Sequence, residues 1–197
     1  MTKIAVVTDS TTYMPPDLLK KHNITVAPQV LIWGDQTYKD GVDIQSGEFF
    51  TRLKTAKVMP TTSQVAVVSF QEIFQDLVNK DFEVLAILVS SKLSGTIQSA
   101  VQARDLMGTG RDKINIVDSQ SVAMALGFQA LAVARAIQAG ASLKEAIELA
   151  ERSHEYTGVF FAVDTLEFLH RGGRIGGAQR FVGTMLNMKP ILAIQDG

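Results

Sequence analysis

Short apolar runs of strand length alternate with helical segments along most of this chain, and this alternation limits the possible folds more than any other feature. The run at 84–89 is continuously apolar, as in a strand whose two faces are both buried. Shorter runs of strand character occur at 3–8, 24–27 and 114–117, and helices are predicted at 16–22, 70–78, 98–107, 122–137 and 143–152. This order predicts an α/β fold with a mostly parallel sheet flanked by helices.

The texture of the sequence changes after the turn residues 156–158, which indicates the start of a second unit. Predicted there are a strand at 159–163, a helical turn at 165–170, a glycine-rich connection at 171–177, a helix near 181–186 and a final strand at 189–194. The last residues, 195–197, carry a turn signal that normally returns a chain along the preceding strand. We therefore predict a first α/β domain at 1–154 and the start of a second, incomplete α/β domain at 155–197.

The composition excludes several classes of protein. Its 19 Lys and Arg balance 20 Asp and Glu, so we expect no nucleic-acid partner, because binding a phosphate backbone usually needs an excess of cations. The chain has no cysteine and only scattered histidines, His22, His154 and His170, so we predict neither a metal site nor a cofactor. We find no signal peptide and no run near the roughly 18 apolar residues of a membrane helix. A cytoplasmic protein is expected.

Hydroxyl side chains follow several of the predicted strands. They are Ser10, Ser94, Ser119 and a group after Pro60 formed by Thr61, Thr62 and Ser63. Ligands of open α/β sheets bind beyond the carboxyl ends of the strands, so these hydroxyls, gathered at one edge, would donate hydrogen bonds to a small oxygen-rich group. Each hydroxyl can instead cap its own helix, which is the commoner role of Ser and Thr at such positions.

Asp9 and Asp118 offer an alternative function, because both follow predicted parallel strands and would share one edge of the sheet. In that alternative the protein is a magnesium-dependent phosphotransferase or hydrolase that uses the two carboxylates. The sequence has no phosphate-binding glycine loop, no nucleophile elbow and no histidine base near these acids. Carboxylates that anchor turns are also commoner than catalytic pairs, so a binding protein without catalysis of its own is favoured.

An ordered series of motifs resembles the DegV family along the whole chain. The motifs are Thr8-Asp9-Ser10, Gly41-Val42-Asp43-Ile44, Pro60-Thr61-Thr62-Ser63-Gln64, the stretch 90–100, Val117-Asp118-Ser119, the stretch 165–175 and Pro190-Ile191-Leu192. No single motif is decisive, but the ordered set is highly specific. The resemblance implies a two-domain α/β carrier that binds one long-chain fatty acid between its domains. It also implies a partner, a separate fatty acid kinase that phosphorylates the presented carboxylate.

The same resemblance implies where the head group lies. The acyl carboxylate would be held by Thr61, Thr62, Ser94 and the backbone of Gly95. Ser10 and Ser119 are placed in the pocket or on its rim because they follow predicted strands, not because of the resemblance. Family members usually have proline where Val65 stands, and they continue beyond Gly197 with further strands and a head-group histidine. We therefore expect the second domain and the pocket of this chain to be incomplete.

Two further groups of residues are assigned from their neighbourhood. The candidate walls of the acyl pocket are Phe160, Phe161, Phe168 and Leu169, although large apolar residues more often simply pack in a core. Arg171 and Arg174 lie on the glycine-rich connection and are predicted at the partner surface, outside the acyl pocket, where they would pair with carboxylates of the kinase. Transient contact with a membrane surface is a further expectation.

Overall fold

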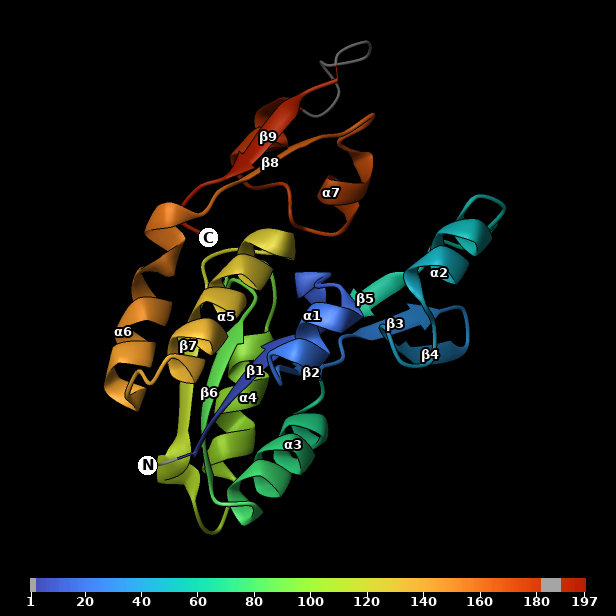
Figure 1. Cartoon of the computed structure of the whole chain (residues 1–197). Coiled ribbons are helices and arrows are strands. Elements are labelled where there is room, and N and C mark those ends of the chain that lie inside the picture. The colour runs from blue at the N-terminus through green and yellow to red at the C-terminus, as the bar shows by residue number, and fades with distance from the viewer. Residues whose placement is uncertain (1–2, 182–188) are drawn as a thin grey trace.

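Four parallel strands form the central sheet in the computed structural model, which describes residues 3–181 and 189–197 (Figure 1). The strands are β1 (Lys3–Asp9), β2 (Thr25–Ala27), β6 (Phe82–Leu88) and β7 (Ile114–Asp118), in the order β2-β1-β6-β7. The register places Val7 opposite Thr25 on one side and Ala86 on the other. The strand order places β2 on one side of β1, and β6 and β7 on the other side, so the order of the strands reverses between β1 and β6. The predicted α/β class is confirmed.

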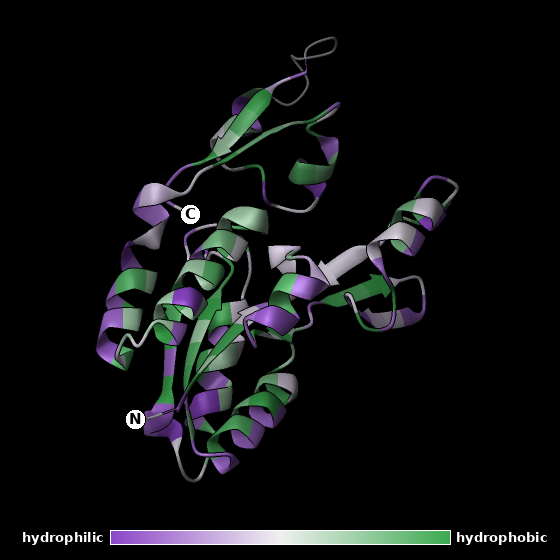
Figure 2. Cartoon of the chain, in the orientation of Figure 1, coloured by the Kyte–Doolittle hydropathy of each residue, from purple (hydrophilic) through white to green (hydrophobic). Residues whose placement is uncertain are grey.

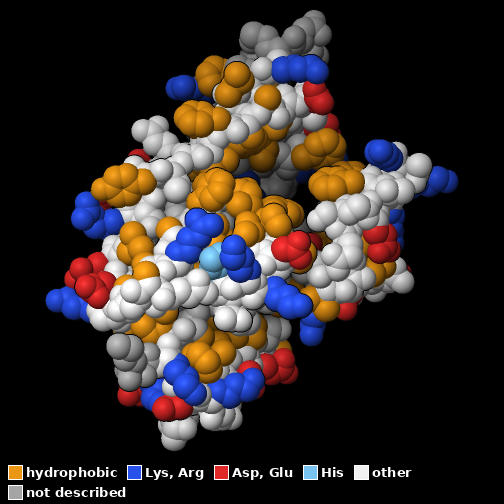
Figure 3. All heavy atoms as spheres, viewed as in Figure 1, with side chains coloured by type: hydrophobic (Ala, Val, Ile, Leu, Met, Phe, Trp, Pro, Cys, Tyr) orange, Lys and Arg blue, Asp and Glu red, His pale blue; other side chains and the backbone are white. Residues whose placement is uncertain are grey.

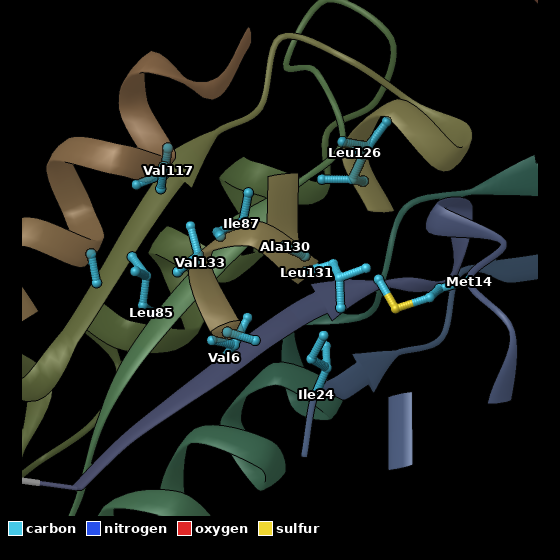
Figure 4. Close-up of a cluster of buried hydrophobic side chains, with 14 residues drawn as sticks. Val6, Met14, Ile24, Leu85, Ile87, Val117, Leu126, Ala130, Leu131 and Val133 are labelled. Carbon is cyan, nitrogen blue, oxygen red and sulfur yellow. The ribbon is translucent and has the colours of Figure 1, made fainter. Parts of the chain in front are cut away.

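Alternate residues of the central strands point to opposite faces, and each face carries its own core. On one face Val6 and Leu85 pack in a cluster with Leu126 (Figure 4). On the other face Val7 packs in a cluster with Phe70. The first face is covered by α1 (Pro16–Lys21), α5 (Ala123–Gln138) and α6 (Leu143–Arg152), and the second by α3 (Val67–Asn79) and α4 (Thr96–Asp105). Because residues 84–88 of β6 lie between both cores, this part of the strand is apolar without interruption (Figure 2).

Helix α6 begins at a capping box. The Ser142 hydroxyl accepts the N–H of Glu145 at 3.3 Å, and the Glu145 carboxylate accepts the N–H of Ser142 at 2.8 Å. These reciprocal bonds satisfy two donors that have no partner within the helix. The bond from the Ser142 backbone, with a second from its hydroxyl, lowers the pKa of Glu145 below its ordinary value of 4.5.

Residues 30–63 form a separate arm that extends to the right in Figure 1. It contains β3 (Val30–Trp33), β4 (Gln36–Lys39), β5 (Thr61–Ser63) and the helix α2 (Ser46–Leu53). The buried side chains of Leu31, Trp33 and Ile44 form its small core. The expectation that Thr61–Ser63 lie at the carboxyl edge of the parallel sheet is wrong, because they pair with β3 in an antiparallel sheet of the order β4-β3-β5.

Residues 159–181 and 189–197 form a smaller C-terminal unit around a two-stranded antiparallel sheet. It contains β8 (Val159–Ala162), α7 (Glu167–Arg171), the 3-10 helix η4 (Gly176–Phe181) and β9 (Ile191–Ile194). Both predicted strands and the helical turn are confirmed, whereas most of the helix expected near 181–186 lies outside the described residues. The proposed domain boundary at 154/155 falls within the 3-10 helix η3 (Ser153–Tyr156) and stays a prediction.

Candidate functional site

A cleft of about 1100 Å³ opens between the α/β body, the arm and the C-terminal unit. Figure 3 shows hydrophobic side chains gathered around this hollow. Apolar wall residues include Leu31 and Phe49 of the arm, Leu93 of the body, and Phe161, Leu169 and Leu192 of the C-terminal unit. Small-molecule pockets usually measure roughly 300–1,000 Å³, so this cleft has room for a large apolar ligand.

Asp9 organises the carboxyl edge of the central sheet. Its carboxylate accepts hydrogen bonds from the N–H and hydroxyl of Thr11 at 3.0 and 2.6 Å, from Gln29 Nε2 at 3.3 Å and from the N–H of Val89 at 2.7 Å. Oδ1 accepts the first three of these bonds and Oδ2 accepts the last, so donors engage both carboxylate oxygens. The fully buried Asp9 thereby joins the ends of β1 and β6 to the segment that follows β2.

Asp118 also anchors a turn. Its carboxylate accepts the N–H of Gln120 at 2.9 Å and lies 3.3 Å from the N–H of Ser91. Among residues 3–181 and 189–197, no cluster of three or more His, Asp or Glu side chains could hold a metal ion. The hydrogen bonds that Asp9 and Asp118 accept therefore favour a structural role for both carboxylates over the magnesium site considered for them.

Two of the residues assigned to the head group, Thr62 and Ser94, line the same cleft. Thr62 comes from the arm, and Ser94 comes from the loop between β6 and α4. The Ser94 hydroxyl lies 2.8 Å from the Thr96 hydroxyl and accepts the Thr96 N–H at 3.3 Å. The antiparallel pairing of β5 with β3 places Thr62 in the arm, and from there it lines the same cleft as Ser94.

Thr61 and Gly95 neighbour these hydroxyls but do not line the cleft. Thr61 precedes Thr62 on β5, and it is Thr62 and the following Ser63 that line the cleft. At Gly95 an added Cβ would lie 3.0 Å from Cδ of Gln64, so the absence of a side chain allows the arm's last segment to approach the start of α4. Roles for Thr61 and Gly95 at the head group stay predictions.

Ser10 and Ser119 do not lie on the cleft wall, so their assignment to the rim is wrong. The Ser10 hydroxyl accepts the backbone N–H of Gln29 at 3.1 Å. The fully buried Ser119 hydroxyl donates to the Ser121 carbonyl at 3.2 Å and accepts the Ser121 N–H at 3.1 Å. Both hydroxyls therefore stabilise loops, the alternative role noted for such residues.

The aromatic walls divide according to the alternation of β8. Phe161 lines the cleft, as does Leu169 of α7. The neighbouring Phe160 points to the other face of the strand and is 79% exposed, so its assignment as a wall is wrong. Phe168 does not line the cleft and is likewise exposed.

The two predicted partner arginines occupy different places. Arg171 lies outside the cleft lining and pairs with Glu167 at 2.6 Å. Arg174 lines the cleft, and its Nε donates to the Leu93 carbonyl at 3.1 Å, so the expectation that it lies outside the pocket is wrong. Lys92 also lines the cleft, which therefore holds cationic groups that the motifs did not predict.

Gln29 and Tyr13 are cleft residues that the sequence analysis missed. Gln29 is 8% exposed, and its Nε2 donates to Asp9 and, at 2.9 Å, to Thr96. It follows Pro28 just beyond β2, and this position at the end of a strand is the sequence signal that marks it. Partial burial, and then the nearby charge of Asp40, raise the pKa of Tyr13 above 10.0.

A family model and proteins of similar sequence point to the same family. A model described as that of an uncharacterised protein of the DegV family matches residues 3–197. A DegV domain-containing protein of Caldanaerobacter subterraneus is 41% identical over 197 residues, a match that covers all of this chain and 69% of the relative. A DegV domain-containing protein of Deinococcus radiodurans is 34% identical, with 98% of this chain and 68% of the relative covered.

Solved structures of similar fold include proteins described as fatty-acid binding. A DegV family protein of Thermus thermophilus, described by its fatty acid binding, has a TM-score of 0.87 at 35% identity and covers 98% of this chain and 68% of its own. A stearic acid-binding protein of Eubacterium ventriosum has a TM-score of 0.91 at 29% identity, and the match covers 100% of this chain and 68% of that protein.

The described ranges of the present chain contain no helix long and apolar enough to cross a bilayer.

Proposed function

This chain belongs to the DegV family, and on that premise we propose that it binds a long-chain fatty acid in the cleft and presents the carboxylate to a fatty acid kinase. The fatty-acid-binding relatives from Thermus thermophilus and Bacillus subtilis support the first part. The observation that carries the proposal is that an apolar wall and the hydroxyls of Thr62 and Ser94 share one cleft.

The acyl chain supplies most of the binding free energy in this proposal. Each buried methylene contributes roughly 0.8 kcal/mol, so a sixteen-carbon chain gains on the order of 12 kcal/mol before the costs of association. The hydroxyls of Thr62 and Ser94 donate hydrogen bonds to the carboxylate, and Lys92 and Arg174, which line the same cleft, complement its charge. This division predicts affinity from the chain and orientation from the head group.

The second part, presentation to a kinase, rests on the family resemblance and on the position of Arg171. The Arg171 side chain is 65% exposed and lies on α7, whose Leu169 lines the cleft. An exposed arginine beside the ligand site attracts an acidic partner surface and pairs bidentately with carboxylates. In this proposal the partner supplies the catalytic groups, and the present chain acts as the carrier.

We place this activity in the cytoplasm, with transient contact at a membrane surface as the source of the fatty acid. Tyr13 and Phe50 support this part of the proposal, because both line the cleft and are 60% and 55% exposed. Partly exposed aromatic side chains suit the boundary between water and lipid.

Denaturing extraction of the purified protein, followed by mass spectrometry, tests the proposed ligand. We expect a long-chain fatty acid in the organic phase. In titrations of lipid-stripped protein, hexanoate lacks ten methylenes of palmitate, which removes up to about 8 kcal/mol, so it should bind at least about a thousandfold more weakly. Equal affinity for the two acids contradicts an acyl-binding cleft.

A further inference from the structure

Four polar side chains form a continuous hydrogen-bonded chain from the buried edge of the sheet to the cleft. They are Asp9, Gln29, Thr96 and Ser94, of which the first three are 0%, 8% and 0% exposed. The backbone of Gln29 is fixed on both sides, because its N–H donates to Ser10 and its carbonyl accepts the N–H of Asp40 at 2.9 Å. A buried network of this kind holds its members in one arrangement when every group is satisfied.

Asp9 determines which way the amide of Gln29 points. All the partners of the Asp9 carboxylate are donors, so the group that faces it from Gln29 must be the NH₂ and not the carbonyl oxygen. The same NH₂ then donates its other proton to the Thr96 hydroxyl at 2.9 Å. Thr96 Oγ1 is thus an acceptor toward Gln29.

Thr96 passes this polarity on to Ser94. The Thr96 proton can reach Ser94 Oγ at 2.8 Å or Gln29 Oε1 at 3.3 Å, and only the first distance lies in the normal range for O–H···O bonds. Ser94 Oγ then accepts both the hydroxyl and the N–H of Thr96, which occupies its two lone pairs. The proton of Ser94 itself is left without a partner in the chain and must point to a ligand or to water in the cleft.

We infer that Gln29 is a positioning residue that, through Thr96, fixes the Ser94 hydroxyl as a donor and makes this subsite selective for an acceptor-only head group. The inference rests on the proposed function and refines it. A carboxylate accepts the Ser94 proton and has none of its own to place. A fatty alcohol of the same length must also donate its proton, and Ser94 has no free lone pair to receive it. The acyl wall is the same for both ligands, so the ratio of their affinities reports the head-group subsite alone.

The test measures dissociation constants of dodecanoate and 1-dodecanol by calorimetry for the unmodified protein and for variants. Gln29→Glu puts a carboxyl group between Asp9 and Thr96. A proton shared with Asp9 occupies one of its oxygens, and the other oxygen is an acceptor that draws the Thr96 proton away and frees a lone pair of Ser94. Thr96→Val removes the relay at nearly constant shape, and Thr96→Ser restores the hydroxyl. Gln195→Glu adds a carboxylate elsewhere on the cleft wall and gives an upper limit for the effect of charge alone.

We expect the unmodified protein and Thr96→Ser to prefer dodecanoate by at least tenfold. Gln29→Glu should lose at least tenfold more dodecanoate affinity than Gln195→Glu does, with dodecanol affinity changed less than threefold, and Thr96→Val should lose at least fivefold of the preference. Retention of the preference in Gln29→Glu and Thr96→Val, or equal loss of both ligands, overturns the inference while leaving fatty acid binding intact. Binding of neither ligand by the unmodified protein overturns the proposed function instead. Because the two variants are independent, failure of one to fold leaves the other decisive.

Discussion

Replacing Asp9 by asparagine should lower the free energy of unfolding considerably, although the two side chains have nearly the same shape. Asparagine has one carbonyl oxygen and one NH₂ where aspartate has two acceptors. If the carbonyl faces Thr11 and Gln29, the NH₂ faces the N–H of Val89 across 2.7 Å, and a buried donor is left unsatisfied. The perturbation therefore acts on the junction of β1 and β6 rather than on an exposed carboxylate.

The magnitude follows from the contacts. An unsatisfied buried donor costs about 1–3 kcal/mol, and each of the remaining bonds weakens by about 1 kcal/mol when its acceptor loses its charge. The neutral amide is cheaper to bury than the carboxylate, which offsets part of this loss. We expect a net decrease in the free energy of unfolding of about 3 kcal/mol, a large part of the roughly 5–15 kcal/mol typical of folded proteins.

Urea unfolding followed by circular dichroism measures this change, and Asp118→Asn is the matched control. With a slope of about 2 kcal/mol per molar urea, Asp9→Asn should lower the midpoint by about 1.5 M. Asp118→Asn should cost less than about 1 kcal/mol, because its carbonyl can still accept the N–H of Gln120. A decrease below about 1 kcal/mol in Asp9→Asn refutes the reasoning. Magnesium-dependent turnover that disappears in both variants at unchanged stability would favour the enzyme alternative.

The remaining predictions concern the ligand, the partner and one helix. Ser94→Ala and Thr62→Ala should each weaken palmitate binding by about 1.5–3 kcal/mol, the usual contribution of a hydrogen bond to a charged group, and calorimetry that shows no loss in either removes these hydroxyls from the head-group site. Arg171→Glu should slow kinase-dependent acyl phosphate formation, with fatty acid affinity within about threefold, or under 1 kcal/mol. The reversal Lys144→Glu on α6, at a side chain that is more exposed and also pairs with a glutamate four residues away, should not slow it, and equal rates for both variants contradict the partner role. Because the native pKa of Glu145 is lowered, its stabilisation of α6 is present above pH 4.5 and is lost as the pH falls through the native value. The stability difference between the unmodified protein and Glu145→Ala, measured by urea unfolding, should therefore disappear in acid and not at neutral pH.

The central sheet was predictable because a strand that is buried on both faces appears in the sequence as a continuous apolar run. The apolar residues of β6 could hardly belong to any other element, and the strands beside it carry the same pattern. The short strand Thr61–Ser63 was not predictable, because it has no apolar alternation and its partner β3 lies much earlier in the chain. Its position in the arm is a tertiary fact that local sequence does not encode.

The candidate site was predictable only in part for a similar reason. A serine that stabilises a loop and a serine that faces a ligand look alike in sequence, so Ser10 and Ser119 could not be separated from Ser94. Strand alternation places Phe160 and Phe161 on opposite faces, but which face borders the cleft depends on how the C-terminal unit packs.

The cleft wall is assembled from three parts of the chain that are far apart in sequence: the arm, the α/β body and the C-terminal unit. A ligand in contact with all three acts as a reversible cross-link, and mass action then ties thermal stability to occupancy. Free ligand at a hundredfold excess over its dissociation constant adds about 2.7 kcal/mol to the stability of the folded state. Under the proposed function, preparations that differ only in residual lipid should therefore melt at different temperatures and resist proteolysis to different extents, although their amino-acid sequence is the same.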